Sequence, residues 1–216
     1  LGEVKSLTST PKILVIGAGT PGRGTEELWS DTGIEIHGVD IFQSPTVDVV
    51  CDGHYLPFAP VSYDGVLIQA VLEHVVEPQK VVAEIFRVLK PNGIIYAETP
   101  FMQQVHEGAY DFTRYTVLGH RYLFKHFELI AQGGNGDPGV VLSWSVRYLT
   151  WSVTRNRSVA KLLGYATGLA LRPFHALFSV RSMYDASSGV YFLGRKVEGY
   201  TLSHKEVVSL YRGQFR

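Results

Sequence analysis

A glycine-rich loop and two aspartates are the first residues of this chain whose types and spacing indicate chemistry. Gly17, Gly19 and Gly22 directly follow an aliphatic run, and glycines at this spacing let a backbone approach a ligand closely. Asp40 lies 21 residues after Gly19, where a carboxylate can accept hydrogen bonds from both ribose hydroxyls of a nucleoside. Asp52 ends the next predicted strand, at 47–52, and can accept a hydrogen bond from an adenine amino group. The loop and the two acids together predict a site for a nucleoside-containing cofactor.

A second group of polar residues lies between positions 99 and 116. It includes His106, Asp111, Arg114 and Tyr115, which lie within ten residues of one another. Such a group can recognise a polar acceptor or remove its proton, and His106 is the candidate general base. The alternative for Asp111 and Arg114 is a structural ion pair that closes the loop. The sequence predicts no metal site.

Aliphatic strands alternate with helices through the first half of the chain. Strands are predicted at 12–16, 35–40, 47–52, 64–68 and 93–98, and helices start at Thr25 and Glu77. This alternation predicts a parallel α/β sheet, whose strands end at one shared edge. The second half is predicted to hold a helix at 116–127, a strand at 128–131, a loop at 132–139, a helical region at 142–184, a strand at 189–194 and a terminal helix at 203–212.

Length and composition limit the classes of protein that this chain can belong to. The chain has 216 residues, which predicts one domain spanning 1–216. Its formal net charge is zero, which argues against a nucleic-acid-binding surface. The single cysteine, Cys51, excludes an internal disulfide, and no secretory signal or transmembrane helix is expected. A cytoplasmic location, with membrane association as a further option, fits these features.

Five stretches in order resemble class I S-adenosylmethionine-dependent methyltransferases of the broad type-11 kind. They are Ile13 to Gly19, His37 to Asp40, Cys51 to Phe58, Tyr63 to Val75 and Glu84 to Gly93. The resemblance implies a Rossmann-like three-layer α/β sandwich. Its mostly parallel, seven-stranded sheet has an antiparallel last strand, preceded here by a helical insert at 142–186. One position departs from the family, because Val15 stands where an acid often helps to bind the amino-acid end of the cofactor.

The resemblance also implies a cofactor, S-adenosylmethionine, and roles by position. Gly17 and its neighbours line the methionine part, Asp40 holds the ribose, Ile41 lies against the adenine, Asp52 or Gly53 contacts the adenine edge, and Gln69 passes near the sulfonium. The expected cofactor-binding residues are Gly17, Ala18, Gly19, Asp40, Ile41, Asp52, Gly53 and Gln69.

The run Leu72-Glu73-His74 is implied to form the wall beside the transferred methyl group. We therefore add His74 to His106 as a catalytic candidate, with a purely structural wall residue as the alternative. Glu73, Asp111, Arg114 and Tyr115 are the residues expected to face the substrate.

The segment 142–184 is basic and rich in aromatic residues. It carries six cationic residues, and no acid stands between Asp137 and Asp185. Three interpretations follow: a helical lid over the substrate pocket, a surface for anionic lipid or a lipid-linked acceptor, or a homodimer interface.

The predicted function is methyl transfer to an O, N or C nucleophile of a small-molecule or glycan-like acceptor. The stretch 99–116 looks like a subgroup found with sugar and cell-surface glycan biosynthesis. Two alternatives are a non-catalytic methyltransferase-like scaffold or nucleoside-binding domain, and an NAD-dependent oxidoreductase. The second is disfavoured because a nicotinamide site has no use for Asp52 or for Leu72-Glu73-His74.

Overall fold

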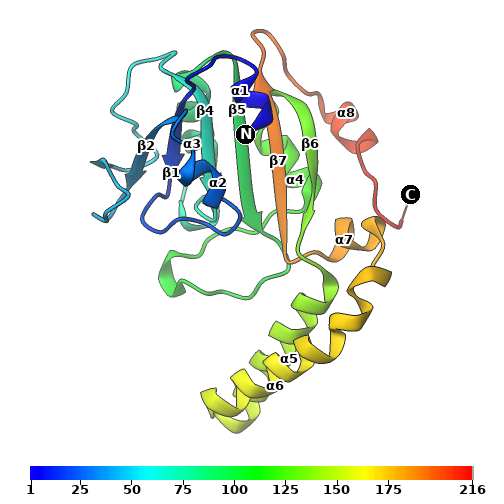
Figure 1. Cartoon of the computed structure of the whole chain (residues 1–216). Helices are drawn as coiled ribbons and strands as arrows, with labels where there is room; N and C mark the ends of the chain where they lie inside the picture. Colours follow the sequence, from blue (N-terminus) through cyan, green and yellow to red (C-terminus); the bar gives the residue numbers. More distant parts are fainter. Residues whose placement is uncertain (216) are drawn as a thin grey trace.

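The computed structural model describes residues 1–215 and contains a seven-stranded sheet with the strand order β3-β2-β1-β4-β5-β7-β6 (Figure 1). The strands are β1 (Lys12–Ile16), β2 (Glu35–Asp40), β3 (Val49–Val50), β4 (Tyr63–Gln69), β5 (Leu89–Pro100), β6 (Phe127–Asn135) and β7 (Gly189–Lys196). The first five strands are mutually parallel, and β7 runs antiparallel to both β5 and β6. The predicted Rossmann-like α/β fold with an antiparallel last strand is confirmed.

The register of the parallel strands brings the predicted cofactor residues to one edge. Ile16, the last residue of β1, pairs with Val39 of β2 and with Ile68 of β4. The next residues along these three strands are Gly17, Asp40 and Gln69. The glycine loop, the ribose-binding candidate and the end of β4 therefore lie side by side where open α/β sheets bind ligands.

Alternate residues of the central strands are buried against opposite faces of the sheet. Leu14 and Ile16 belong to a core completed by α3 (Pro78–Val88), whose Val81 and Ile85 are fully buried. Ile13 and Val15 face a thinner layer made by α1 (Gly2–Lys5) and α2 (Glu26–Ser30). Burial on both faces explains why these strands are continuously aliphatic.

Three strand predictions were wrong in extent. The strand predicted at 93–98 is part of the longer β5, which starts at Leu89 and ends at Pro100. The strand predicted at 47–52 is reduced to Val49–Val50 at the edge of the sheet, where β3 has β2 as its one strand neighbour. The strand predicted at 128–131 extends to Asn135, so the first half of the loop predicted at 132–139 is wrong. Its glycines fit a strand because β7 pairs with β6 as far as Asn135 and Gly189.

The helices between β6 and β7 are α5 (Pro138–Thr154), α6 (Arg157–Leu171), a 3-10 segment (Arg172–Leu177) and α7 (Val180–Ala186). The helical region begins four residues before the predicted position, because the Asp137 side chain accepts the N–H groups of Gly139 and Val140 and so caps α5. α5 and α6 form a hairpin that projects beyond the sheet (Figure 1).

The remaining helical elements are short. They are a 3-10 turn at Leu72–His74, another at Gly108–Tyr110, α4 (Val117–Leu123) after the N-cap Thr116, and α8 (His204–Ser209). The helices predicted at 116–127 and 203–212 are thus present but shorter. Within residues 1–215, no helix has the length and apolar character needed to cross a membrane.

Candidate active site at the carboxyl edge of the sheet

The Asp40 carboxylate is held in place by two backbone N–H groups. Gly19 donates to Oδ2 at 2.9 Å and Phe42 donates to Oδ1 at 3.1 Å. A side chain on Gly19 would collide with this carboxylate, since an ideal Cβ there would lie 2.7 Å from Asp40 Oδ2. Each carboxylate oxygen keeps lone-pair capacity for one more donor. This geometry suits a pair of ribose hydroxyls.

Apolar side chains lie exposed beside Asp40. Ile41 is 58% exposed and Phe42 is 73% exposed, although both are large hydrophobic residues. Asp52 accepts hydrogen bonds through Oδ1 from the backbone N–H (2.9 Å) and the Nδ1 (2.5 Å) of His54. The backbone hydrogen bond from His54 is the largest of the causes that lower the pKa of Asp52. An ionised acceptor and open apolar surface fit a purine ring and its amino group.

The other predicted cofactor residues have mainly structural contacts. The backbone N–H of Ala18 donates to Val39 O (3.0 Å), and its carbonyl accepts from Thr46 Oγ1 (2.6 Å). Gln69 Nε2 donates to Glu98 Oε2 (2.7 Å) and to Arg23 O (3.2 Å), so this side chain ties the glycine loop to β5.

Gly17 adopts a positive φ of 82°, and an ideal Cβ at this position would lie 2.2 Å from a methyl carbon of Val71. Val15 is 5% exposed and lies in the apolar core. At Gly53 a Cβ would make ordinary contacts only.

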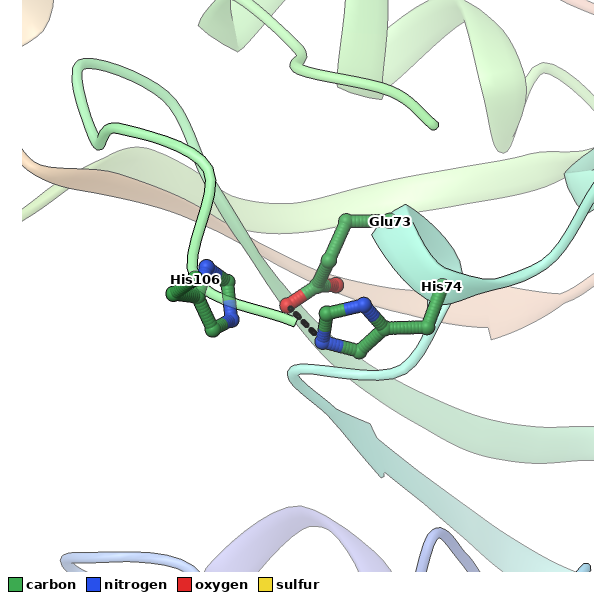
Figure 2. Close-up of side chains that lie close together, drawn as sticks. All are labelled: Glu73, His74 and His106. Atoms are coloured by element: carbon green, nitrogen blue, oxygen red, sulfur yellow. Dashed lines mark ion pairs between the residues drawn. The ribbon is translucent and has the colours of Figure 1, made fainter. Parts of the chain in front are cut away.

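Glu73, His74 and His106 converge from two loops, as Figure 2 shows. One ligand atom from each of the three residues lies within 4.8 Å of the other two. Glu73 and His74 belong to the 3-10 turn after β4, and His106 comes from the loop after β5. The backbone joins the two loops, because Phe112 N–H donates to Glu73 O at 2.8 Å. The structure therefore brings both predicted catalytic histidines together with one predicted substrate residue.

Each histidine has a partner for its Nδ1 atom. His74 Nδ1 lies 2.6 Å from Tyr110 O, and His106 Nδ1 lies 3.2 Å from Asp111 Oδ2. Because a carbonyl only accepts hydrogen bonds, the Nδ1 atom of His74 must carry hydrogen. In the neutral imidazole of His74 the lone pair is then on Nε2. His74 Nε2 lies 3.5 Å from Glu73 Oε1.

Glu73 is a buried carboxyl group without a hydrogen-bond donor. Its residue is fully buried, and neither carboxyl oxygen has a hydrogen-bond partner among residues 1–215. Burial raises the pKa of Glu73 to about 7, against the lowering effects of the nearby His74 and Arg114. The side chains of His74 and His106 are 22% and 29% exposed, so solvent reaches the cluster past the two rings.

Asp111 and Arg114 form an ion pair inside the loop. The Arg114 guanidinium donates to both carboxylate oxygens, which lowers the pKa of Asp111 well below its usual range. The substrate-binding role predicted for both residues stays a prediction. Tyr115 lies elsewhere, packed against the small apolar core around Val117 and against the His120 ring, with 5.9 Å between ring centroids.

Sequence reasoning missed a cavity between the glycine loop and the helical hairpin. Its volume is about 500 Å³. The cationic or titratable side chains that line it are Arg23, Arg147, Lys161, Arg172 and His175, and none of the lining residues within 1–215 is acidic. Within residues 1–215, the arginines and the lysine of this set form no ion pair. The excess of basic residues in the insert signalled the charge, but their convergence with Arg23 depends on the fold.

Comparison with known proteins shows what this chain is similar to. Residues 14–97 match the family described as "Methyltransferase domain". The chain is 31% identical over 150 residues to a demethylmenaquinone methyltransferase of Renibacterium salmoninarum, which covers 63% of this chain and 59% of that protein. Both matches support a class I S-adenosylmethionine-dependent methyltransferase.

Solved methyltransferase structures share the fold at low sequence identity. A putative sarcosine dimethylglycine methyltransferase from Galdieria sulphuraria matches with a TM-score of 0.58 and 17% identity, covering 91% of this chain and 82% of that one. The phosphoethanolamine N-methyltransferase 2 of Haemonchus contortus, with a TM-score of 0.53 and 17% identity, covers 91% and 52%. The [4+2]-cyclase SpnF has a TM-score of 0.52 with 18% identity, covering 91% and 79%, so this methyltransferase-like fold also serves other chemistry.

A second relative, a demethylmenaquinone methyltransferase of Paenarthrobacter aurescens, is 35% identical over 99 residues and covers 40% of this chain. The chain spans 59% and 38% of the lengths of the two curated methyltransferases it matches.

Proposed function

We propose that this protein transfers a methyl group from S-adenosylmethionine to a nucleophilic atom of a polar acceptor. The observation that carries the proposal is the Asp40 carboxylate, fixed by the Gly19 and Phe42 N–H groups. It lies on the same sheet edge from which the loops carrying Glu73, His74 and His106 emerge. When bound, S-adenosylmethionine supplies the electrophilic methyl group.

The chain's own residues bind the cofactor and orient it toward the acceptor. Asp40 accepts the ribose hydroxyls, Ile41 covers one face of the adenine, and Asp52 accepts the adenine amino group. The open backbone at Gly17 and Gly19 admits the methionine part. Holding two reactants in line supplies much of the rate enhancement in such a reaction, and the cluster of Glu73 and the two histidines promotes loss of the acceptor's proton.

Cofactor binding to Asp40 variants tests the proposal. Calorimetric titration of the folded chain with S-adenosylmethionine should show one site. Asp40→Asn should weaken binding about ten- to a hundredfold, because a charge-assisted pair of hydrogen bonds is lost. Asp64→Asn is the matched control, since Asp64 also accepts a backbone N–H (from Lys12, 2.9 Å) but at the opposite edge of the sheet. Absence of binding to the folded wild type, or an Asp40 variant with unchanged affinity, refutes the proposal.

The basic cavity supports an acceptor that carries a phosphate or another anionic group. The positive charges of Arg23, Arg147, Arg172 and Lys161 favour an anion, because none of the described residues that line the cavity is acidic. The hydroxyl of Tyr148, on the same hairpin, donates to Val105 O at 3.0 Å, beside His106. This chemistry includes the glycan- or lipid-linked acceptors predicted from the sequence.

Pyrophosphate can serve as the probe for this cavity. We expect Arg147→Ser to weaken pyrophosphate binding about tenfold, while Lys205→Ser, on exposed α8, leaves it unchanged. Equal affinities for the two variants would count against an anionic acceptor.

The outer surface of the hairpin supports a second proposal, contact with a membrane that holds such an acceptor. Leu149, Val153 and Leu162 are each more than 60% exposed on these helices, next to the basic residues. Vesicles that contain anionic lipid should retain the protein in a flotation assay, and neutral vesicles should not. A dimer through the same face would instead appear as a doubled mass in solution.

A further inference from the structure

We propose that Glu73, His74 and His106 form a binding site for one divalent transition-metal ion of the zinc class. The inference goes beyond methyl transfer as such. Metal binding itself does not depend on the proposed function, but the role of the ion toward the acceptor rests on it.

The arrangement of lone pairs is the first reason. His74 Nδ1 donates to Tyr110 O, which leaves the lone pair of His74 Nε2 available, and His106 Nδ1 lies 3.2 Å from Asp111 Oδ2. The Glu73 carboxyl oxygens are fully buried acceptors without a donor among residues 1–215. Three acceptor groups within 4.8 Å therefore face one another. A single proton can bridge only two of them, whereas a cation satisfies all three.

The second reason is the set of contacts behind the two imidazoles. Histidines that bind a metal almost always donate their other ring N–H to a carbonyl or a carboxylate, which fixes the tautomer and the orientation of the ring. His74 has the carbonyl of Tyr110 and His106 has the carboxylate of Asp111, itself held by Arg114. Both types of supporting contact are thus present at one cluster.

The donor set selects the kind of ion. Two imidazoles and one carboxylate suit zinc and its neighbours, while magnesium prefers oxygen ligands and water. Three protein ligands leave at least one coordination position open, as in catalytic zinc sites. Partial exposure of the two rings gives the ion and an acceptor a path to the site.

The open position gives the ion a task in the proposed reaction. An acceptor hydroxyl that occupies it releases its proton to water more readily, because the positive charge stabilises the oxygen anion that remains. In the metal-bound protein, neither His74 nor His106 accepts the proton of the acceptor hydroxyl. The two histidines predicted as bases become ligands, and Asp111 becomes a positioning residue behind His106.

Metal binding to the full-length chain, measured without cofactor or acceptor, tests the inference. After treatment with a chelator and its removal, titration with Zn²⁺ should show one saturable site. Titration with Co²⁺ should give the visible absorption bands of a four- or five-coordinate ion. Mg²⁺ should compete with neither ion.

Variants separate this site from adventitious binding at other histidines. His106→Ala and His74→Ala should each lower Zn²⁺ affinity at least about tenfold and alter the cobalt spectrum, and Asp111→Asn should lower the affinity about tenfold. His126→Ala is the matched control, because His126 is exposed, is hydrogen-bonded to Thr201 and does not belong to the cluster. Glu73→Gln keeps the shape of the buried side chain and should also weaken binding.

The inference is overturned if the folded wild type binds no Zn²⁺, or if His106→Ala binds it as tightly as the wild type. The separate titration with S-adenosylmethionine distinguishes this failure from a failure of the proposed function. Cofactor binding without zinc binding removes the metal site alone, and zinc binding without cofactor binding removes methyl transfer alone.

Discussion

Acid should destabilise this protein through His120, a histidine buried in α4. The residue is fully inaccessible to solvent, and neither ring nitrogen has a hydrogen-bond partner among residues 1–215. Its ring packs against Phe124 and Tyr115, with centroid distances of 5.1 and 5.9 Å. Burial lowers the pKa of His120 to about 3, because a charged imidazole would lose its hydration without gaining a partner.

The sign and size of the effect follow from proton linkage. The unfolded chain, with an ordinary histidine pKa of 6.5, binds the proton first as the pH falls. The stabilising contribution of the neutral buried ring is therefore complete above pH 6.5 and is lost as the pH falls toward 3. Between pH 7 and pH 4 the loss amounts to about 3 kcal/mol, a large share of the 5–15 kcal/mol typical of a folded domain.

His120→Phe isolates this contribution, because phenylalanine fills a similar volume and does not titrate. Urea denaturation of both proteins at several pH values between 7 and 4 gives the free energy of unfolding as a function of pH. We expect the variant to lose about 3 kcal/mol less than the wild type over this range. Any packing cost of the larger ring is the same at each pH and cancels in the comparison.

Exposed His126 supplies the control. His126→Phe should leave the pH dependence as it is in the wild type, because the imidazole there already meets solvent. If the wild type and His120→Phe lose stability in parallel, to within about 0.5 kcal/mol, then His120 does not titrate as burial requires and the reasoning is refuted.

Two further predictions concern the hairpin and the loop after β5. Replacing Gly164 or Gly168 by alanine raises the helix propensity of α6 by the same amount. A Cβ at position 164 would lie 2.8 Å from the Cβ of Arg147, whereas a Cβ at position 168 would make ordinary contacts only. Thermal unfolding should show that Gly168→Ala is more stable by about 0.5–1 kcal/mol and that Gly164→Ala is not. Arg114→Lys should lower the free energy of unfolding by about 1–3 kcal/mol, because lysine cannot form the bidentate ion pair with Asp111. It should also speed amide hydrogen exchange at residues 103–111, and unchanged exchange would contradict this prediction.

The parts of the site that sequence predicts well are those fixed by the backbone. Gly17, Gly19 and Asp40 are predictable because a strand followed by glycines and a strand ending in an acid must meet at one sheet edge once the strands are parallel. The convergence of His74 and His106 follows in the same way, since both lie just after neighbouring strands.

Side-chain direction was less predictable than position. Gln69 stands at the expected place but bonds to Glu98 and to the Arg23 carbonyl, and Tyr115 packs into a small core. Both outcomes depend on partners distant in sequence. The extension of β6 to Asn135 was missed for a similar reason, because pairing with β7 outweighs the low strand propensity of its glycines.

The contacts of Arg114 favour the structural one of the two interpretations that its spacing from Asp111 left open. A guanidinium has five N–H donors, and here they are used for both oxygens of Asp111 and for the carbonyls of Gln103, Gln104 and Thr113. All five bonds stay within residues 103–114, so no donor remains for an acceptor. Arg114 therefore fixes the loop, and through Asp111, which also accepts the backbone N–H of His106 at 2.9 Å, it fixes the imidazole that faces Glu73. The Asp111–Arg114 ion pair thus acts on the site by restricting the motion of His106. The three-residue spacing of Asp111 and Arg114 allows the pair to form within one turn of the loop.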